Sequence, residues 1–222
     1  MVGKIKFLVL VVILLIGTTA AKAQFGVSGG MSVLKGFGVP KPYIGMHFGG
    51  EIPRDDQITL YARLSLYARQ QEPTNGYTIV TATDATTIPY SQTISYASTF
   101  NYTIVEGGTR YYIGNGYDSG FGAYGGSTLM LAVNSVKRKY GDYDQSKYEL
   151  PTSELSKGSI FNLGFGLGGG VKNTFAGIGT VYLDMNLAYM ILSTASNSTA
   201  QNTSLYAPLL FSFNLGFRKE FY

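Results

Sequence analysis

The sequence has no cysteine, a single histidine and few charged residues, and each shortage narrows the kinds of protein it can encode. Without cysteine, neither a disulfide framework nor a thiolate metal site can form. Charged residues make up 14% of the chain, about half the usual share of roughly a quarter. Glycine and tyrosine are abundant instead, with 29 and 18 residues. This composition is untypical of an ordinary soluble domain.

The chain also has no apolar run long enough to cross a bilayer as a helix. Its most apolar segment, Phe7 to Ile16, is about ten residues long, whereas a spanning helix needs roughly 20. Lysines precede this segment and Ala21-Lys22-Ala23 follows it, which is the pattern of a secretory signal peptide cleaved before Gln24. A permanent membrane anchor is the alternative. We therefore expect residues 1–23 to be removed and residues 24–222 to form one domain.

The positive charge of the chain falls when the signal peptide leaves. Three of the 17 lysines and arginines leave with it, and the 14 that remain face 13 acidic residues, a net charge of about +1. The densest basic cluster, Lys137-Arg138-Lys139, is interpreted as a solvated loop. A nucleic-acid partner would require a basic patch that follows the phosphates, so we expect none.

Apolar and polar residues alternate with a period of two along most of the chain, which predicts β-strands and excludes helices. In residues 209–221 the odd positions are leucine and phenylalanine, with Lys219 excepted, and the even positions from Ser212 onward are small or polar. The polar parity carries glycine, serine, asparagine and tyrosine with isolated charges, not the many lysines and glutamates of a water-facing surface. A narrow membrane barrel requires such an interior. The same alternation marks residues 43–52, 60–69, 160–171 and 180–191.

Three weaker strands bring the total to eight, the kind of even number that closes a single-chain antiparallel barrel. The connections alternate between short turns and long polar loops, as in outer-membrane barrels with short periplasmic turns and long external loops. We therefore predict an all-β, eight-stranded antiparallel up-and-down transmembrane β-barrel, with ten strands as the alternative. The weaker strands are 24–34, 98–114 and 121–136; the turns are 53–56, 115–120 and 172–176; the loops are 35–42, 70–97, 137–157 and 193–205.

The mature chain resembles the small outer-membrane β-barrel family of Bacteroidota-type bacteria, which shares the architecture of the transmembrane part of OmpA-like proteins. The resemblance rests on the signal-peptide ending Ala-Lys-Ala-Gln, on residues 105–112 and on residues 214–222. It implies that the barrel-assembly machinery recognises a C-terminal signal. By analogy, some such barrels are accessory subunits of secretion or gliding complexes. The implied assembly signal comprises Asn214, Gly216, Phe217, Phe221 and Tyr222, with Lys219 at a position that is usually apolar.

Charged residues on the polar parity predict a network inside the barrel. The interior of an eight-stranded barrel is only wide enough for side chains, and buried charges are costly unless they are paired. We therefore expect these residues to pair and to fill the lumen; an ion pathway, in a narrow pore or transporter, is the alternative. The predicted lumen network comprises His47, Glu51, Arg63, Glu106, Arg110, Asp184, Arg218 and Glu220.

The sequence supports an enzyme less well than a structural barrel. His47, Glu51 and Ser65 could form a catalytic set like that of lipid A-modifying enzymes, but their inward parity keeps them away from lipid. The glycine-rich run 164–170 superficially matches a dinucleotide fingerprint, yet a turn and another strand follow it where a helix is required. We expect no enzyme activity, no cofactor and no metal.

Segment 70–97 is longer than a hairpin needs and is rich in threonine, serine and tyrosine. We expect it to extend the third and fourth strands outside the membrane and to pair with another outer-membrane or cell-surface protein; a loop that only shields the barrel mouth is the alternative. The predicted function is a non-enzymatic structural or interaction barrel in contact with outer-membrane lipid. Eight tyrosines near strand ends are predicted to anchor it at the membrane interface: Tyr43, Tyr67, Tyr117, Tyr140, Tyr143, Tyr189, Tyr206 and Tyr222.

Overall fold

The computed structural model describes residues 24–72, 74–151, 156–197 and 206–221, and these residues form strands, turns and loops. Within these ranges there is no helix long and apolar enough to cross a membrane. The predicted signal peptide lies outside the described residues. The strands are β1 (Phe25–Gly36), β2 (Tyr43–Pro53), β3 (Ile58–Tyr67), β4 (Gln70–Gln71), β5 (Gly76–Ala82), β6 (Ser91–Gly114), β7 (Gly120–Tyr140), β8 (Tyr148–Glu149), β9 (Lys157–Phe175), β10 (Gly179–Ala195) and β11 (Leu209–Phe221).

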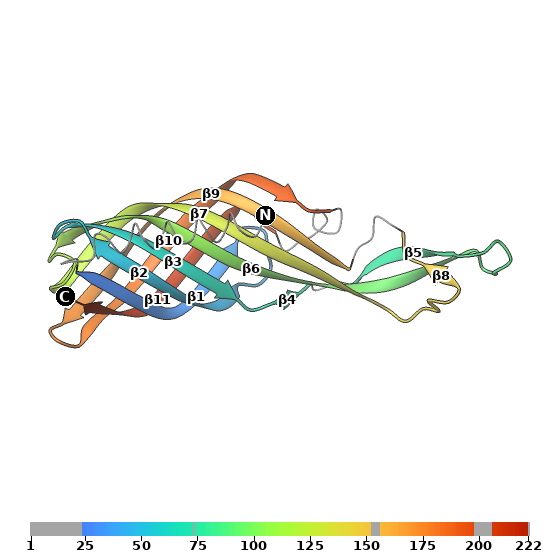
Figure 1. Ribbon diagram of the computed structural model, residues 1–222, viewed down its shortest axis with the longest axis horizontal. Coiled ribbons are helices and arrows are strands. Elements are labelled where there is room, and N and C mark those ends of the chain that lie inside the picture. Colours follow the sequence, from blue (N-terminus) through green and yellow to red (C-terminus); the bar gives the residue numbers. More distant parts are fainter. Residues whose placement is uncertain (1–23, 73, 152–155, 198–205, 222) are drawn as a thin grey trace, which may run out of the picture.

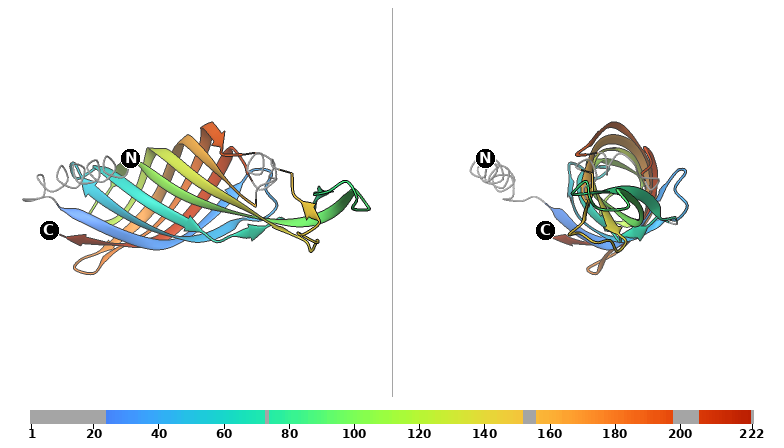
Figure 2. Two further views of the ribbon diagram at one scale, coloured as in Figure 1. Left: turned by 45° about the vertical axis from the view of Figure 1, so that its right-hand side comes forward. Right: turned by 90° about the vertical axis from the view of Figure 1, so that its right-hand side faces the viewer.

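Eight long antiparallel strands close into a ring, in the order β1, β2, β3, β6, β7, β9, β10, β11. The ring closes because β1 pairs with β11 along the whole length of β1, from Phe25 opposite Phe221 to Gly36 opposite Leu210. Figure 2 shows the ring end-on. The predicted eight-stranded antiparallel up-and-down barrel is confirmed. The shortest ring strands have 10 to 13 residues, which matches the about 9–11 tilted residues that cross a hydrocarbon layer.

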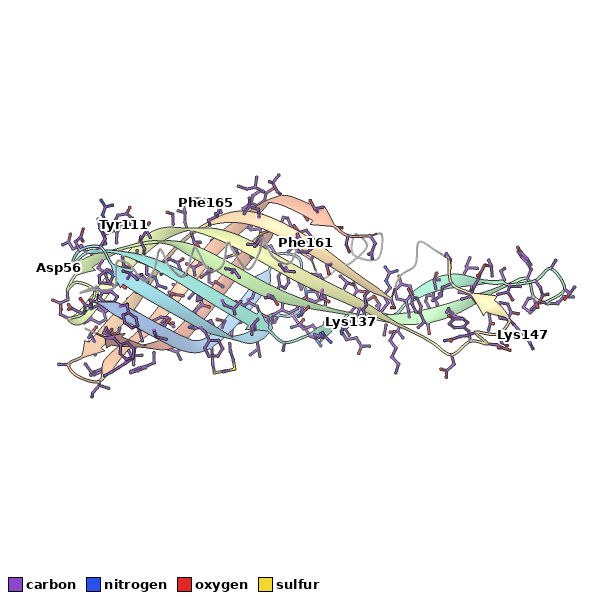
Figure 3. All side chains as sticks on the ribbon, in the orientation of Figure 1. Asp56, Tyr111, Lys137, Lys147, Phe161 and Phe165 are labelled. Carbon is purple, nitrogen blue, oxygen red and sulfur yellow. The ribbon has the colours of Figure 1, made fainter. Side chains whose placement is uncertain are left out.

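The alternation of the sequence decides which side chains face out. On β2, Ile44, Met46 and Phe48 are each more than half exposed, while Tyr43 and His47 on the other parity are fully buried. Phe161 and Phe165 point away from the barrel in the same way (Figure 3). Because successive side chains of a strand point to opposite faces, the period of two produces an apolar outside and a mostly polar inside.

The connections fall at the two ends of the barrel as predicted. The short turns 54–57, 115–119 and 176–178 lie at one end, and the long connections lie at the other. Three predicted boundaries are wrong, because pairing continues past the point where apolar alternation stops. Strand β9 continues through the predicted turn to Phe175, so Lys172 lies within a strand. The predicted loop Lys137-Arg138-Lys139 belongs to β7, and Arg138 is buried. The predicted loop 193–205 begins later, because β10 runs to Ala195.

Beyond the barrel, the chain forms an arm on the side of the long connections (Figure 1). Strand β6 has 24 residues, a length of about 80 Å at 3.3 Å per residue. Its C-terminal half pairs with β3 in the ring, and its first residues pair with β5. Strand β8 adds to the outer edge of β5. The ten-strand alternative is wrong. β5 pairs with β8 and with the part of β6 that extends beyond the ring, and it does not stand between two ring strands.

The half of the lumen nearer the long connections is filled by apolar and aromatic side chains. Tyr43, Phe100 and Tyr102 pack against one another there, with ring centroids 5.0 to 6.2 Å apart. Their cluster also contains Leu34, Tyr67, Ile104, Met130, Val136, Ile160, Met190 and Leu210. The barrel is therefore closed at this level by a packed core.

This core corrects part of the tyrosine prediction. Tyr43 and Tyr67 belong to it and are 0% and 6% exposed, so they line the lumen and do not anchor the barrel at a membrane surface. Tyr117, in the short turn 115–119, is 1% exposed and packs with Tyr112 and Tyr124 at the turn end of the barrel, so it is no anchor either. Tyr43 and Tyr67 stand on the inward parity of β2 and β3, which outweighs their position near strand ends. Tyr189 does face outward, with 56% exposure.

Candidate functional site

The eight residues of the predicted lumen network all lie inside the barrel, each less than a tenth exposed. They occupy the half of the lumen nearer the short turns. The strand register brings them together: Arg63 on β3 stands directly opposite Glu106 on β6. The two side chains form an ion pair across that step of the ladder.

Asp184 on β10 is the centre of the network. Its carboxylate accepts hydrogen bonds from Arg63 at 3.1 Å and from Arg110 at 2.8 Å. The amide of Asn214 donates a third, at 2.7 Å. Two arginines from the adjacent strands β3 and β6, four residues apart in the register, are thereby held to one carboxylate on the far side of the lumen. Such charge-assisted bonds are among the strongest in proteins.

Glu51 forms a second centre nearer the short turns. Its Oε2 accepts hydrogen bonds from Arg110 at 2.7 Å and from Arg218 at 2.8 Å. Its Oε1 accepts from the hydroxyls of Thr59 at 2.5 Å and Tyr112 at 2.7 Å. Because Arg110 bonds to both Glu51 and Asp184, it joins the two centres. Arg218 extends the set to Glu220, with Nε 3.0 Å from Oε1.

His47 connects to the network through hydroxyl and amide groups. Ser32 donates its single hydroxyl proton to Asn214 Oδ1 at 2.6 Å. His47 Nδ1, 2.8 Å from the same hydroxyl oxygen, must therefore be a donor. Its Nε2 then accepts from the Tyr182 hydroxyl at 2.6 Å. Since Asn214 also bonds to Asp184, all eight predicted residues form one connected network.

The catalytic set considered from the sequence does not assemble. Ser65 is the register partner of His47 on the adjacent strand, but both ring nitrogens of His47 are used by Ser32 and Tyr182. The carboxylate of Glu51 is used by the arginines described above. In the described part of the chain there is also no group of three or more histidine, cysteine or acidic side chains arranged to hold a metal ion.

Lys172 is the main interior charge that sequence reasoning missed. It is 2% exposed and donates to the Ser119 carbonyl at 2.6 Å. The signal was present, since the inward parity of Asn162 and the glycines 164–170 continues to position 172. With Lys172, this half of the lumen holds four cations and four carboxylates: Arg63, Arg110, Lys172 and Arg218 against Glu51, Glu106, Asp184 and Glu220.

Aromatic rings and close packing complete this half of the lumen. The guanidinium of Arg110 lies 4.3 Å from the ring centroid of Tyr61 and 5.0 Å from that of Tyr124. Arg218 lies 3.8 Å from the centroid of Tyr117. A cavity lined by Arg110, Asp184 and their neighbours has a volume of about 10 Å³, the size of a single water molecule. The charged side chains of this half therefore pair with one another, and the cavity beside them is too small for a substrate.

The predicted assembly signal occupies the closing strand. Asn214 and Gly216 face the lumen, and the side chains of Phe217 and Phe221 face outward with 42% and 44% exposure. The Phe221 ring stacks on that of Phe25 across the closing pair, at 5.1 Å. The side chain of Tyr222 lies outside the described residues. Recognition by an assembly machinery stays a prediction.

The arm is the second candidate site, and it has a small core of its own. Val80, Ala82 and Ile94 from the hairpin are buried against Tyr148, with Tyr140, Tyr143 and Leu150 packed around them. The Tyr148 hydroxyl donates to the Pro89 carbonyl at 2.9 Å. Residues 141–150 therefore cover one face of the hairpin and hold it in a defined shape.

The opposite face of the arm is open. Tyr77 and Ile79 on β5 are 73% and 53% exposed, and Ile88 and Tyr90 near the tip are 92% and 64% exposed. These side chains lie beyond the barrel, where water would surround them. Large apolar and aromatic groups that are held rigid and exposed are typical of contact surfaces for other proteins.

The fold and these two sites define a closed eight-stranded barrel with a plugged, ion-paired lumen and a rigid arm at one end. No protein-family model matches the chain, and no curated protein matches it. Among solved structures, Neisserial surface protein A is similar over 89% of this chain and 95% of its own, with 10% identity and a TM-score of 0.49.

Two further solved structures are similar at the same level. The outer membrane protein OprG from Pseudomonas aeruginosa matches over 90% of this chain and 96% of its own, with 14% identity and a TM-score of 0.45. Ail, the attachment invasion locus protein of Yersinia pestis, solved with the heparin analogue sucrose octasulfate, matches over 89% and 99%, with 13% identity and a TM-score of 0.43. At these TM-scores the likenesses carry no argument about binding or activity, and the fold rests on the strand pairing itself.

Proposed function

We propose that the mature chain is a non-enzymatic β-barrel of the outer membrane, with a structural role for its closed lumen and a protein-binding role for its arm. The observation that carries the proposal is the inversion of polarity: the exposed side chains of the ring are mostly phenylalanine, leucine, isoleucine, methionine and valine, and the ion pairs of the barrel are inside. A water-soluble monomer rarely exposes an apolar patch above about 300–600 Å². Contact with lipid requires such an outer face.

The filled lumen supports a structural role over that of a pore or transporter. One half is closed by the aromatic and aliphatic cluster around Tyr43 and Phe100, and the other by the network around Glu51 and Asp184. A permeating solute would have to displace buried, paired charges, which is costly. We expect purified protein in planar bilayers to give no stable openings. Large, lasting conductance steps would refute the closed-lumen part of the proposal.

The arm supports the interaction role because its binding face is formed before any partner arrives. Preorganisation lowers the entropic cost of binding, and the open edge of β5 from Gly76 to Val80 offers backbone groups for an added strand. The expected partner is another outer-membrane or cell-surface protein.

Affinity purification of two variants tests this role. In the first, a short Gly-Ser link replaces residues 74–96; the junction is sound because Glu72 N already donates to Ser98 O at 2.9 Å. In the second, Tyr77→Ser and Ile79→Thr change the open face and leave the arm core intact. We expect both variants to fold and to lose the same partner. An unchanged set of partners with either variant would remove the arm as a recognition element.

A further inference from the structure

We propose that the outward face of β7 and β9, at the end of the barrel that carries the arm, binds the phosphate groups of lipid headgroups in the outer leaflet. This inference rests on the proposed position of the barrel in a membrane. Three lysines lie on the outward parity of these strands: Lys137 and Lys139 on β7, and Lys157 on β9. Lys139 and Lys157 are exposed and Lys137 is partly exposed.

The register of β7 and β9 orders the outward residues into layers. Val133 stands opposite Phe161, Ser135 opposite Ser159, and Lys137 opposite Lys157. Apolar, hydroxyl and ammonium pairs therefore follow one another away from the apolar band. Figure 3 shows the same order along the barrel, with Phe165 and Phe161 on the band and Lys137 where the strands leave it. Four residues of a tilted strand place the lysine pair about 10 Å beyond the last apolar pair, at the level of lipid headgroups.

The lysine pair needs an anion. Like charges directly opposite each other on one face of a sheet destabilise it. In the described ranges no ion pair joins Lys137, Lys139 or Lys157 to another residue, and their outward neighbours Thr99 and Ser135 are uncharged. A phosphate between the two ammonium groups would turn the repulsion into two charge-assisted contacts.

The opposite end of the barrel differs, which gives the proposal its direction. There the outward Lys219 already donates to the carbonyls of Gly177 and Ile178, at 2.7 and 3.0 Å. The exposed charges around the short turns include the carboxylates of Asp55, Asp56 and Asp118. Phosphate is therefore attracted to the lysines of β7 and β9, unpaired among the described residues, whereas Lys219 at the turn end is already bound by carbonyl oxygens.

The test uses the folded, full-length chain in detergent micelles, titrated with bis-phosphorylated lipid A and followed by native mass spectrometry. The variant Lys137→Gln/Lys157→Gln is compared with Arg54→Gln/Lys147→Gln, which removes the same charge from the turn end and the arm. Each lysine near an anionic surface contributes roughly a fivefold gain in affinity, so the first variant is expected to bind about 25-fold more weakly. The control is expected to bind as the wild type does, and dephosphorylated lipid A to bind as weakly as the first variant.

Three results would overturn the inference: equal binding by the two variants, equal binding of phosphorylated and dephosphorylated lipid A, or displacement of lipid A by inorganic phosphate alone, which would indicate a site for the free ion. Protease protection of the barrel in lipid vesicles is measured alongside. A chain that fails to insert refutes the proposed function as well, whereas a chain that inserts and binds without regard to these lysines refutes this inference alone.

Discussion

Replacing Asp184 with asparagine tests whether the lumen is held by paired charges. The substitution keeps the size of the side chain and one carbonyl oxygen but removes the negative charge that Arg63 and Arg110 share. It also leaves Asn214 opposite an amide, where a carboxylate had accepted its hydrogen bond. The change acts on stability alone, because the site has no room for a ligand.

The expected magnitude follows from the remaining partners. Breaking a buried ion pair usually costs about 3–5 kcal/mol. Here Arg63 keeps Glu106 and Arg110 keeps Glu51, so neither guanidinium is left without a carboxylate. We therefore expect the lower limit, a decrease of about 3 kcal/mol in the free energy of unfolding. A double-mutant cycle with Arg110→Gln should give a coupling energy of about 1–3 kcal/mol.

Urea unfolding of the barrel in lipid vesicles measures both quantities, with the heat-modifiable electrophoretic shift as the probe of the folded state. Asp56→Asn is the control, because Asp56 is exposed in a short turn and surface changes usually stay within about 0.5 kcal/mol. If Asp184→Asn were no more destabilising than Asp56→Asn, the lumen would have to be hydrated enough to screen its charges, and the argument for a dry, paired interior would be refuted.

Three further predictions concern closure and the arm. Deletion of residues 217–222 removes five of the twelve residue pairs between β1 and β11 and leaves unpaired backbone groups in lipid, so we expect no heat-modifiable barrel; a folded band would contradict the ring. Tyr148→Ala should cost the arm about 3–5 kcal/mol of local stability, seen as faster hydrogen exchange in β5, while urea unfolding of the barrel stays unchanged. Hydrogen bonds from the side chain and then the backbone of Thr86 hold the pKa of Asp84 below its ordinary value. The Asp84 turn is therefore stable above the ordinary pKa and is lost as pH falls through the lower folded value; NMR titration at the ordinary value would contradict this.

The barrel architecture could be predicted because its main signal in the sequence, the alternation of apolar and polar residues, is contained within each strand. Alternation along a single strand, as in residues 211–221, already indicates which side chains face outward and which face the lumen. The strand count and the two kinds of connection followed from the same pattern. Boundaries were less predictable, because the pairing of β7 and β9 continues past the residues in which apolar and polar side chains alternate. Lys172 and Arg138 were misplaced for that reason.

The membership of the lumen network was predictable, but its partners were not. Parity indicates that Arg63 and Asp184 both face inward, yet they are 121 positions apart and meet only through the curvature and stagger of the closed ring. The aromatic core around Tyr43 and Phe100 was missed because tyrosines near strand ends were assigned to the membrane surface. Parity was the better guide, since a side chain on the inward parity of a narrow barrel can only fill its interior.

The lumen network bears on recognition although it touches no partner. Strands β6 and β7 run without interruption from the barrel toward the arm, paired from Gly114 opposite Gly122 to Tyr96 opposite Tyr140. The same two strands contribute Glu106, Arg110 and Tyr124 to the interior network. Side chains that fix these strands inside the barrel therefore also fix the direction in which the hairpin leaves it. A binding face held in one orientation loses less entropy on association than a hinged one. In the proposed function, the paired lumen is therefore the base that orients the arm for a partner.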